Sequence, residues 1–321
     1  MKLIISTLAL GAAFLSACGT TASSSERVPE ADHAITAIED SDTSSEAVEL
    51  APEFEPVRFS IPGDVAESSS EGQIDWSGNT VRATGTGVVD TRNTNRAQAR
   101  LMAERAAVVV AQRNLLEAVK GVRVDSETRV ENFMTDYDVI YTRVEGVVRN
   151  ARQLGPAVYD SLSGTVEVEL EMDIHGSQGL SGAISEALTG QGPVPVSMSD
   201  QTRDFLQQYS ALVFDGSQAG LQPSMYPKIY DADGNLLIDT SQYASYLGAG
   251  GQTAMQFISD LDALLSQPAF SGSPLVVNVR QITGQLGTDI VLGREESDAL
   301  GWLKTGLPFL MGAGKFLLSV I

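Results

Sequence analysis

The sequence predicts an α+β protein with two folded parts. A long alanine-rich helical pattern over residues 95–120 lies between two β-prone runs, at residues 80–90 and 164–174. The second run alternates apolar and polar residues, which indicates a strand with one buried face and one face in water. We therefore expect a long Ala-rich helix packed on a small, mostly antiparallel sheet, followed by a second small α/β domain over residues 201–321.

Residues 1–17 have the pattern of a lipoprotein signal peptide. Lys2 supplies a positive start, and residues 3–14 form an apolar run that is short for a membrane span. The residues Leu15-Ser16-Ala17-Cys18 resemble a bacterial lipobox, in which the chain is cut before the cysteine and its thiol is acylated. An ordinary cleaved signal with an incidental cysteine is the alternative. Cys18 is the single cysteine of the chain, which excludes an internal disulfide.

The residue after Cys18 bears on the destination of the chain. It is Gly19 rather than Asp, and the resemblance to sorted lipoproteins then implies the outer membrane, because Asp at this position is the usual inner-membrane retention signal. We expect the partner of Cys18 to be the lipid bilayer, since each buried acyl CH₂ contributes roughly 0.8 kcal/mol. The body would lie in the periplasm.

Residues 18–78 have the composition of an acidic, disordered tether. Residues 19–75 hold fourteen acidic residues against two arginines, and large apolar residues are few. Such a segment is extended by its own charge and opposes nucleic-acid binding. Residues 47–61 carry several apolar side chains and could instead dock on a partner or on the body, but a plain linker is the preferred interpretation.

The first domain is expected over residues 79–176. Its helix would begin after a cap at Asn93 or Thr94 and end at Gly121 in the left-handed conformation. One face of the helix gathers the apolar residues that we expect to be buried, which are Ala97, Leu101, Val108, Ala111, Leu115 and Val119.

The remainder of this domain is expected to hold an irregular segment and a hairpin. Residues 125–141 show no clear period, whereas residues 144–154 and 164–174 are β-prone and enclose turn residues. One face of the last strand would carry a row of carboxylates. A cation could bind such a row, but a solvated face is the commoner meaning and the one preferred; the row consists of Glu167, Glu169, Glu171 and Asp173.

Gly85-Thr86-Gly87 before a helix invites comparison with a dinucleotide-binding loop. The third glycine of that motif is missing, since position 90 is Asp, and the strands that follow are of antiparallel type. The preferred interpretation is that the glycines let the helix cross closely over the strand.

Several motifs of this domain occur in the order found in one family. They are Gly85-Thr86-Gly87, Arg113-Asn114-Leu115-Leu116-Glu117, Gly121-Val122-Arg123-Val124-Asp125 and Val144-Glu145-Gly146-Val147-Val148. Over roughly residues 80–175 the chain resembles the small outer-membrane lipoprotein family (the LPP-twenty family) that includes the flagellar lipoprotein FlgP. The resemblance implies a non-enzymatic envelope protein that multimerises under the outer membrane around the flagellar motor. The acidic tether and the C-terminal domain depart from that family's small size.

Residues 177–200 are rich in Gly, Ser and Pro and are expected to form a linker with a short helix at 181–188. The second domain then follows. Asp231-Ala232-Asp233-Gly234-Asn235 has glycine at the wrong place for a calcium loop, so a hairpin turn is preferred. Its elements are expected as helices at 202–208, 254–265 and 295–303 and strands at 211–215, 228–230, 236–238, 275–282, 288–292 and 315–321.

The sequence holds no convincing catalytic site. The two histidines, His33 and His175, have no partner at metal-ligand spacing, and we expect no metal, no cofactor and no enzyme activity. The first functional hypothesis is a self-assembling homo-oligomeric structural component of the envelope. The alternative is a periplasmic binding module that recognises peptidoglycan, a polysaccharide or a partner protein through the C-terminal domain.

Overall fold

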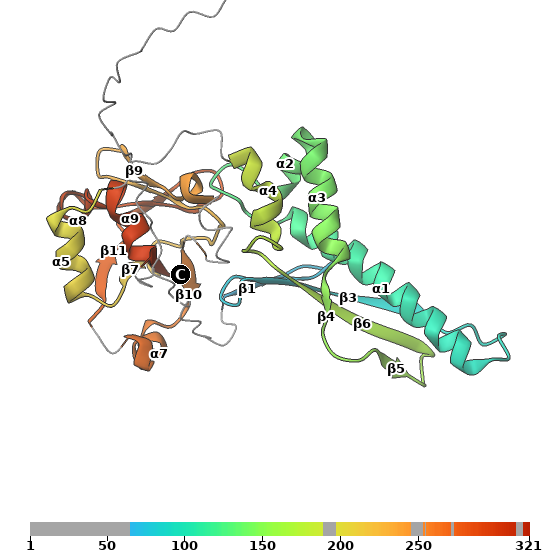
Figure 1. Cartoon of the computed structure of the whole chain (residues 1–321). Helices are drawn as coiled ribbons and strands as arrows, with labels where there is room; N and C mark the ends of the chain where they lie inside the picture. The colour runs from blue at the N-terminus through green and yellow to red at the C-terminus, as the bar shows by residue number, and fades with distance from the viewer. Residues whose placement is uncertain (1–64, 189–196, 245–252, 254, 271–272, 313–316) are drawn as a thin grey trace, which may run out of the picture. The chain divides into compact units, whose positions relative to one another are not determined.

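A computed structural model shows the α+β architecture that the sequence predicts (Figure 1). The structure describes residues 65–188, 197–244, 253, 255–270, 273–312 and 317–321. Within these ranges no helix combines the length and the apolar character needed to cross a bilayer. The signal peptide, the apolar run at 47–61 and most of the tether lie outside them.

The first domain is built on an antiparallel sheet. Its two long strands pair along their whole length, from Thr80 opposite Asp173 to Val88 opposite Thr165. Residues 66–75, which their composition assigns to the tether, form two short strands at one side of this sheet. The strands are β1 (Ala66–Ser68), β2 (Gln73–Asp75), β3 (Thr80–Val88), β4 (Arg152–Gln153), β5 (Val158–Asp160) and β6 (Thr165–Asp173).

Helix α1 (Arg96–Lys120) lies along one side of β3 and β6 (Figure 1). The predicted helix is confirmed, but both caps differ from the expectation. Asn95 is the N-cap, its side chain accepting the N–H of Gln98, and Gly121 keeps right-handed backbone angles. The predicted buried face is wrong in the N-terminal half, where Leu101 is 59% exposed. Alanines four residues apart contact the sheet instead, and these are Ala99, Ala103, Ala107 and Ala111.

Three further helices complete the first domain, α2 (Val130–Asp136), α3 (Asp138–Arg149) and α4 (Leu180–Leu188). The irregular segment expected at 125–141 therefore ends at residue 129, and the strand expected at 144–154 is wrong except for Arg152–Gln153, which form β4 and pair with β6. Ile140, Val144 and Val148 are buried on one side of α3. Their spacing of four residues is a helical period, and it outweighs the preference of β-branched residues for strands.

The second domain contains two four-stranded sheets. In one, the order is β10-β14-β7-β11 and every neighbouring pair is parallel; in the other, the order is β12-β13-β8-β9. The strands are β7 (Leu212–Asp215), β8 (Lys228–Tyr230), β9 (Leu236–Asp239), β10 (Gln256–Ile258), β11 (Leu275–Asn278), β12 (Gln281–Thr283), β13 (Asp289–Val291) and β14 (Leu317–Val320).

The helices of this domain agree with the sequence in part. The helix expected at 254–265 is wrong in its first half, which forms β10, and a helix that was not expected runs around Pro308. The turn expected at Asp231 is confirmed, since its carboxylate accepts the N–H groups of Asp233 and Asn235 between β8 and β9. The helical segments are α5 (Asp200–Gln208), η1 (Thr240–Tyr243), α7 (Leu261–Leu265), η2 (Pro268–Phe270), α8 (Arg294–Leu300) and α9 (Leu303–Gly312).

Candidate functional site

Cys18 is the one site residue that the sequence predicts, and it lies outside the described residues. Its acylation therefore stays a prediction.

The two glycines of β3 lie where the strand meets α1 most closely. A Cβ atom on Gly85 would lie 2.2 Å from the carbonyl oxygen of Ala107, and one on Gly87 would lie 1.9 Å from that of Ala103. Only glycine fits such an approach of strand to helix backbone. This confirms the packing interpretation of Gly85-Thr86-Gly87, because the backbone of α1 lies directly against both glycines.

The acidic row on β6 is not uniformly solvated. Glu171 is only 4% exposed; the Nε of Arg82 donates to its carboxylate at 2.6 Å, and Arg152 forms a second ion pair with it. The expectation that Glu171 faces water is therefore wrong, because two guanidinium groups compensate its charge at the sheet surface. The other three carboxylates of the row are exposed or half-buried.

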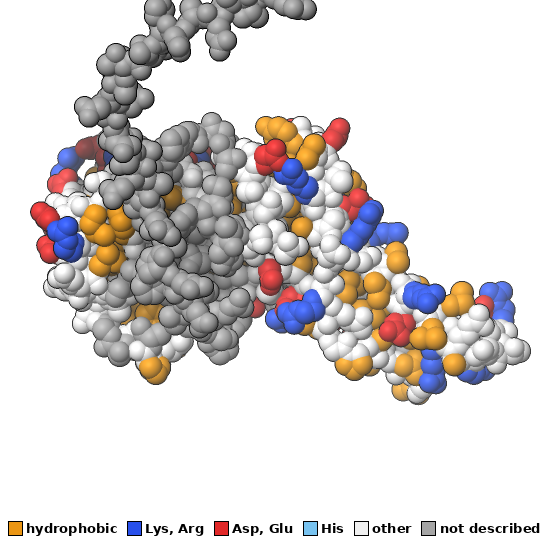
Figure 2. All heavy atoms as spheres, in the orientation of Figure 1, with side chains coloured by type: hydrophobic (Ala, Val, Ile, Leu, Met, Phe, Trp, Pro, Cys, Tyr) orange, Lys and Arg blue, Asp and Glu red, His pale blue; other side chains and the backbone are white. Residues whose placement is uncertain are grey.

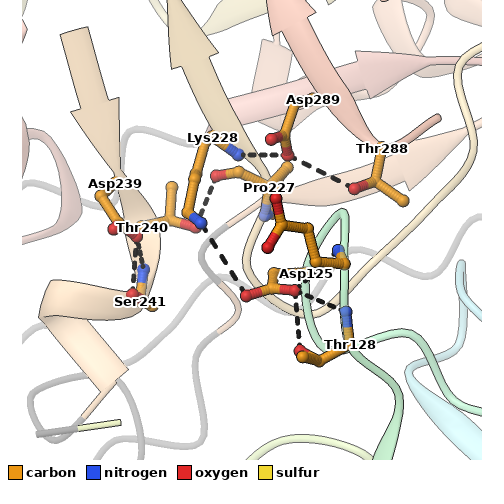
Figure 3. Close-up of polar contacts among 10 residues, drawn as sticks. Asp125, Thr128, Pro227, Lys228, Asp239, Thr240, Ser241, Thr288 and Asp289 are labelled. Carbon is orange, nitrogen blue, oxygen red and sulfur yellow. Dashed lines mark hydrogen bonds and ion pairs between the residues drawn. The ribbon is translucent and has the colours of Figure 1, made fainter. Parts of the chain in front are cut away.

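A second charged cluster lies around Lys228 at the start of β8 (Figure 3). The ammonium of Lys228 lies 3.9 Å from the carboxylate of Asp125. Burial opposes the charge of Lys228, but the carboxylates of Asp125, Asp239 and Asp289 outweigh it and hold the pKa of Lys228 above its usual value. Lys228 therefore keeps its proton and is unsuited to act as a nucleophile.

The carboxylates around Lys228 are held by their own hydrogen bonds. Asp125 accepts the N–H of Thr128 at 2.8 Å and its hydroxyl at 2.7 Å. Asp289, which is almost fully buried, accepts the backbone N–H of Lys228 at 3.0 Å (Figure 3). Burial raises the pKa of Asp289. The cluster thus connects the loop before α2 to β8 and β13. Its charged side chains interact with other residues of the same cluster.

No group of three or more His, Cys, Asp or Glu side chains suited to a metal ion occurs among the described residues. The sequence carried no sign of the Lys228 cluster, since about a hundred positions separate Asp125 from Lys228. Sequence periodicity indicates which residues are neighbours on one helix or strand. It does not indicate pairs such as Asp125 and Lys228, which lie on separate elements.

His175 follows β6 and is buried. Its Nδ1 atom has no hydrogen-bond partner among the described residues, and its ring meets that of Tyr226 edge to face at 6.4 Å between centroids. Burial lowers the pKa of His175 to about 4. The neutral imidazole of His175 packs as an aromatic side chain, and it still has a ring nitrogen that can bind a proton at low pH.

A polar pocket of about 410 Å³ lies between α3, β6 and the start of α4. Its lining includes the buried Glu171 and the apolar residues Val147, Ala151, Met172 and Ala183. No sequence pattern indicates this pocket, because its lining comes from three separate segments. The polar side chains that line it are Arg143, Asn150, Arg152, Asp173, Ser177 and Gln178.

The side of α1 turned away from the sheet is apolar and basic. Leu101 and Met102 are each 59% exposed and Val109 is 57% exposed, although residues of this size are more often buried. Arg105 and Arg113 follow Leu101 and Val109 at helical spacing and are exposed. We call these five residues the α1 outer face. Figure 2 shows the same mixture of hydrophobic and basic side chains on the part that holds α1.

The side of the sheet opposite α1 is acidic around Glu167 and Glu169, whereas Arg82 and Arg152 on the same side pair with Glu171. Val158 and Thr86 lie opposite Glu167 in the strand pairing and therefore share its side of the sheet, and Glu169 follows on the same side. Glu167 is exposed, as are Thr86 and Val158. We call these four residues the open sheet face. The first domain consists here of α1 packed on the sheet. It thus presents the basic, apolar α1 outer face on one side and the acidic open sheet face on the other.

The comparisons with known proteins concern the second domain. A model of the second domain of Treponema pallidum Tp0624 matches residues 211–307, a little under a third of the chain. This range runs from β7 into α9 and includes most of the Lys228 cluster. A search of curated proteins finds no match.

The resemblance of residues 80–175 to the small outer-membrane lipoprotein family is wrong, since the family that matches is the second domain of Tp0624 and the match lies elsewhere in the chain. The structure supplies a physical reason. Gly85, Gly87 and the alanines of α1 follow from close strand-to-helix packing, and Val144–Val148 belongs to a helix. Motifs that arise from packing recur in unrelated proteins. The chain is similar over residues 211–307 to the second domain of Treponema pallidum Tp0624.

Proposed function

We propose that the protein is a non-enzymatic lipoprotein of the bacterial outer membrane whose first domain assembles into homo-oligomers. The signal pattern, Cys18 and Gly19 support the anchor and its destination. The observation that carries the assembly is the pair of complementary surfaces on opposite sides of the first domain. The flagellar role rested on the family resemblance alone and loses its support with it.

The α1 outer face has the composition of a protein–protein contact. Three large apolar side chains are exposed together, and two arginines and no carboxylate lie among them. Clustered apolar surface rimmed by polar groups marks interaction sites on soluble domains. In a chain of net charge −20, this basic surface stands out against the rest of the molecule.

A second copy fits this surface because each copy also carries the acidic open sheet face. The α1 outer face of one copy would contact the open sheet face of the next, with arginines opposite Glu167 and Glu169. Two different surfaces in contact make a heterologous interface, which produces a ring where the rotation closes and a filament where it does not. Charge complementarity sets how the two copies align, and the apolar side chains of the α1 outer face supply the buried apolar surface.

The charged clusters support a role without catalysis. Lys228 keeps its proton, and the carboxylates around it accept hydrogen bonds from neighbouring residues. Glu171 is likewise engaged by two arginines. Each of these charged groups therefore forms its ion pairs or hydrogen bonds with another residue of the chain.

Reversing the charges of the α1 outer face should weaken self-association. The double change Arg105→Glu and Arg113→Glu places like charges opposite Glu167 and Glu169, and we expect a loss of at least about tenfold in affinity between copies. Sedimentation velocity of the full chain in detergent measures it. High salt should weaken the unchanged protein too, because ions screen exposed charges.

Two further variants make this test specific. Adding Glu167→Arg and Glu169→Arg to the reversed chain restores opposite charges and should restore association. Arg280→Glu is the matched control, since Arg280 is exposed in the second domain, and it should leave association unchanged. A chain that stays monomeric at high concentration, or a reversal without effect, contradicts the assembly.

Cys18→Ser should release the protein from membranes, because the acyl chains that hold it need the thiol. Fractionation of cells into membrane and soluble parts measures the change, and Thr20→Ala is the matched control. Gly19→Asp tests the destination and should move the protein to the inner membrane. A Cys18→Ser chain that remains in the membrane fraction refutes the lipid anchor.

A further inference from the structure

One carboxylate of the pocket between α3, β6 and α4 is shared by two arginines, of which one lines the pocket. Glu171 forms ion pairs with both Arg82 and Arg152, so one carboxylate faces two guanidinium groups. The side chain of Arg152 is 68% exposed and lines the pocket. A guanidinium carries five donors and binds a carboxylate through two of them. Arg152 therefore has donors available for an anion from solution.

The same pocket offers a second carboxylate, beyond the one that pairs with Arg152. Asp173 is exposed and lines the pocket, two residues beyond Glu171 on the same side of β6. Two residues along a strand span about 7 Å between Cα atoms. Among the described residues no arginine pairs with Asp173, in contrast to Glu171, so Asp173 can accept a cation.

Neutral hydrogen-bonding side chains lie between these charges. Asn150 and Gln178 each bring one amide to the pocket, and Ser177 brings a hydroxyl. A side-chain amide both donates and accepts hydrogen bonds, and a peptide group offers one N–H donor and one carbonyl acceptor for such bonds. The volume of about 410 Å³ falls within the range of small-molecule sites, which is roughly 300–1,000 Å³.

We propose that this pocket binds a small zwitterionic ligand of amino-acid to short-peptide size. The carboxylate of the ligand pairs with Arg152, its ammonium pairs with Asp173, and Asn150 and Gln178 bind the peptide group between them. The site uses neither the α1 outer face nor the open sheet face, so it goes beyond the proposed assembly and each proposal can fail alone.

Two sources supply this chemistry, free peptides of L-amino acids and cell-wall peptides that contain D-amino acids. Saturation-transfer NMR on the full chain in detergent distinguishes them, with Ala-Ala in its all-L and its all-D form as probes. Each probe is compared with its N-acetyl and its C-terminal amide derivative. The free dipeptide of one configuration should bind, and blocking either end should weaken binding by at least about tenfold, because a charge-assisted hydrogen bond is lost.

The variants Asp173→Asn and Arg152→Gln should each reduce binding of the free dipeptide by a similar factor. Asp173 is exposed, so its change should leave the fold intact, and circular dichroism checks this for both variants. Asp204→Asn removes the same charge from an exposed position on α5 and should bind normally. Equal binding of free and blocked peptides, normal binding by Asp173→Asn, or no transfer at millimolar dipeptide overturns the proposal.

Discussion

Replacing Gly87 by alanine is expected to destabilise the first domain by about 3 kcal/mol or more, because the added methyl group overpacks a contact that cannot yield. The new Cβ atom would lie 1.9 Å from the carbonyl oxygen of Ala103. That oxygen belongs to the backbone of α1, so relief requires the whole helix to move from the sheet. Chemical denaturation of the variant and the unchanged protein measures the loss.

Gly146 provides the matched control for Gly87. It lies within α3, and a Cβ atom there would meet nothing within 4 Å. Gly146→Ala should therefore stabilise the helix by about 1 kcal/mol, since alanine is the better helix former. If Gly87→Ala proves as stable as the unchanged protein, then α1 and β3 do not approach as closely as described.

The stability of the protein should fall by about 3 kcal/mol between neutral pH and pH 4 through His175 alone. Burial lowers the folded-state pKa of His175 from 6.5 to about 4. Well above pH 6.5 the imidazole is neutral in both states and contributes no difference. Between pH 6.5 and 4 the unfolded chain binds the proton and the folded chain does not, so the free energy of unfolding falls as the pH falls.

His175→Phe isolates this contribution because it keeps an aromatic ring beside Tyr226 and removes the titrating group. Other groups titrate over the same range in both proteins, so the difference between the two denaturation series is the quantity to compare. The variant should lose about 3 kcal/mol less on acidification, and His175→Gln gives a second comparison if the ring packs poorly. Parallel stability curves for variant and unchanged protein would show that His175 titrates normally in the folded state.

Local periodicity explains which elements could be predicted from the sequence. The alternation in β6 and the length of the α1 pattern each lie within one element, and both are confirmed. The α1 buried face was misassigned because hydrophobicity alone favoured Leu101. The sheet below α1 presents glycines at that point, and only alanine is small enough to lie between the two backbones.

The region of α3 shows a different limit. Val144, Val147 and Val148 prefer strands as isolated residues, but burial of every fourth position stabilises a helix. The charged sites show a third limit, since Glu171 meets Arg82 across the sheet and Lys228 meets Asp125 across two domains. Pairs of this kind depend on the packed arrangement, and the order of residues in the chain contains no direct sign of them.

The position of β14 sets an order of events for folding. This strand lies between β10 and β7 in a parallel sheet, although it comes after both in the chain. A chain that stops before Leu317 leaves β10 without a partner in that sheet, and pairing across more than a hundred residues is slow because a large loop must close first. This sheet therefore cannot be completed until β14 is available. For the export that we propose, translocation requires an unfolded polypeptide, and this order of pairing would postpone completion of the sheet until passage ends.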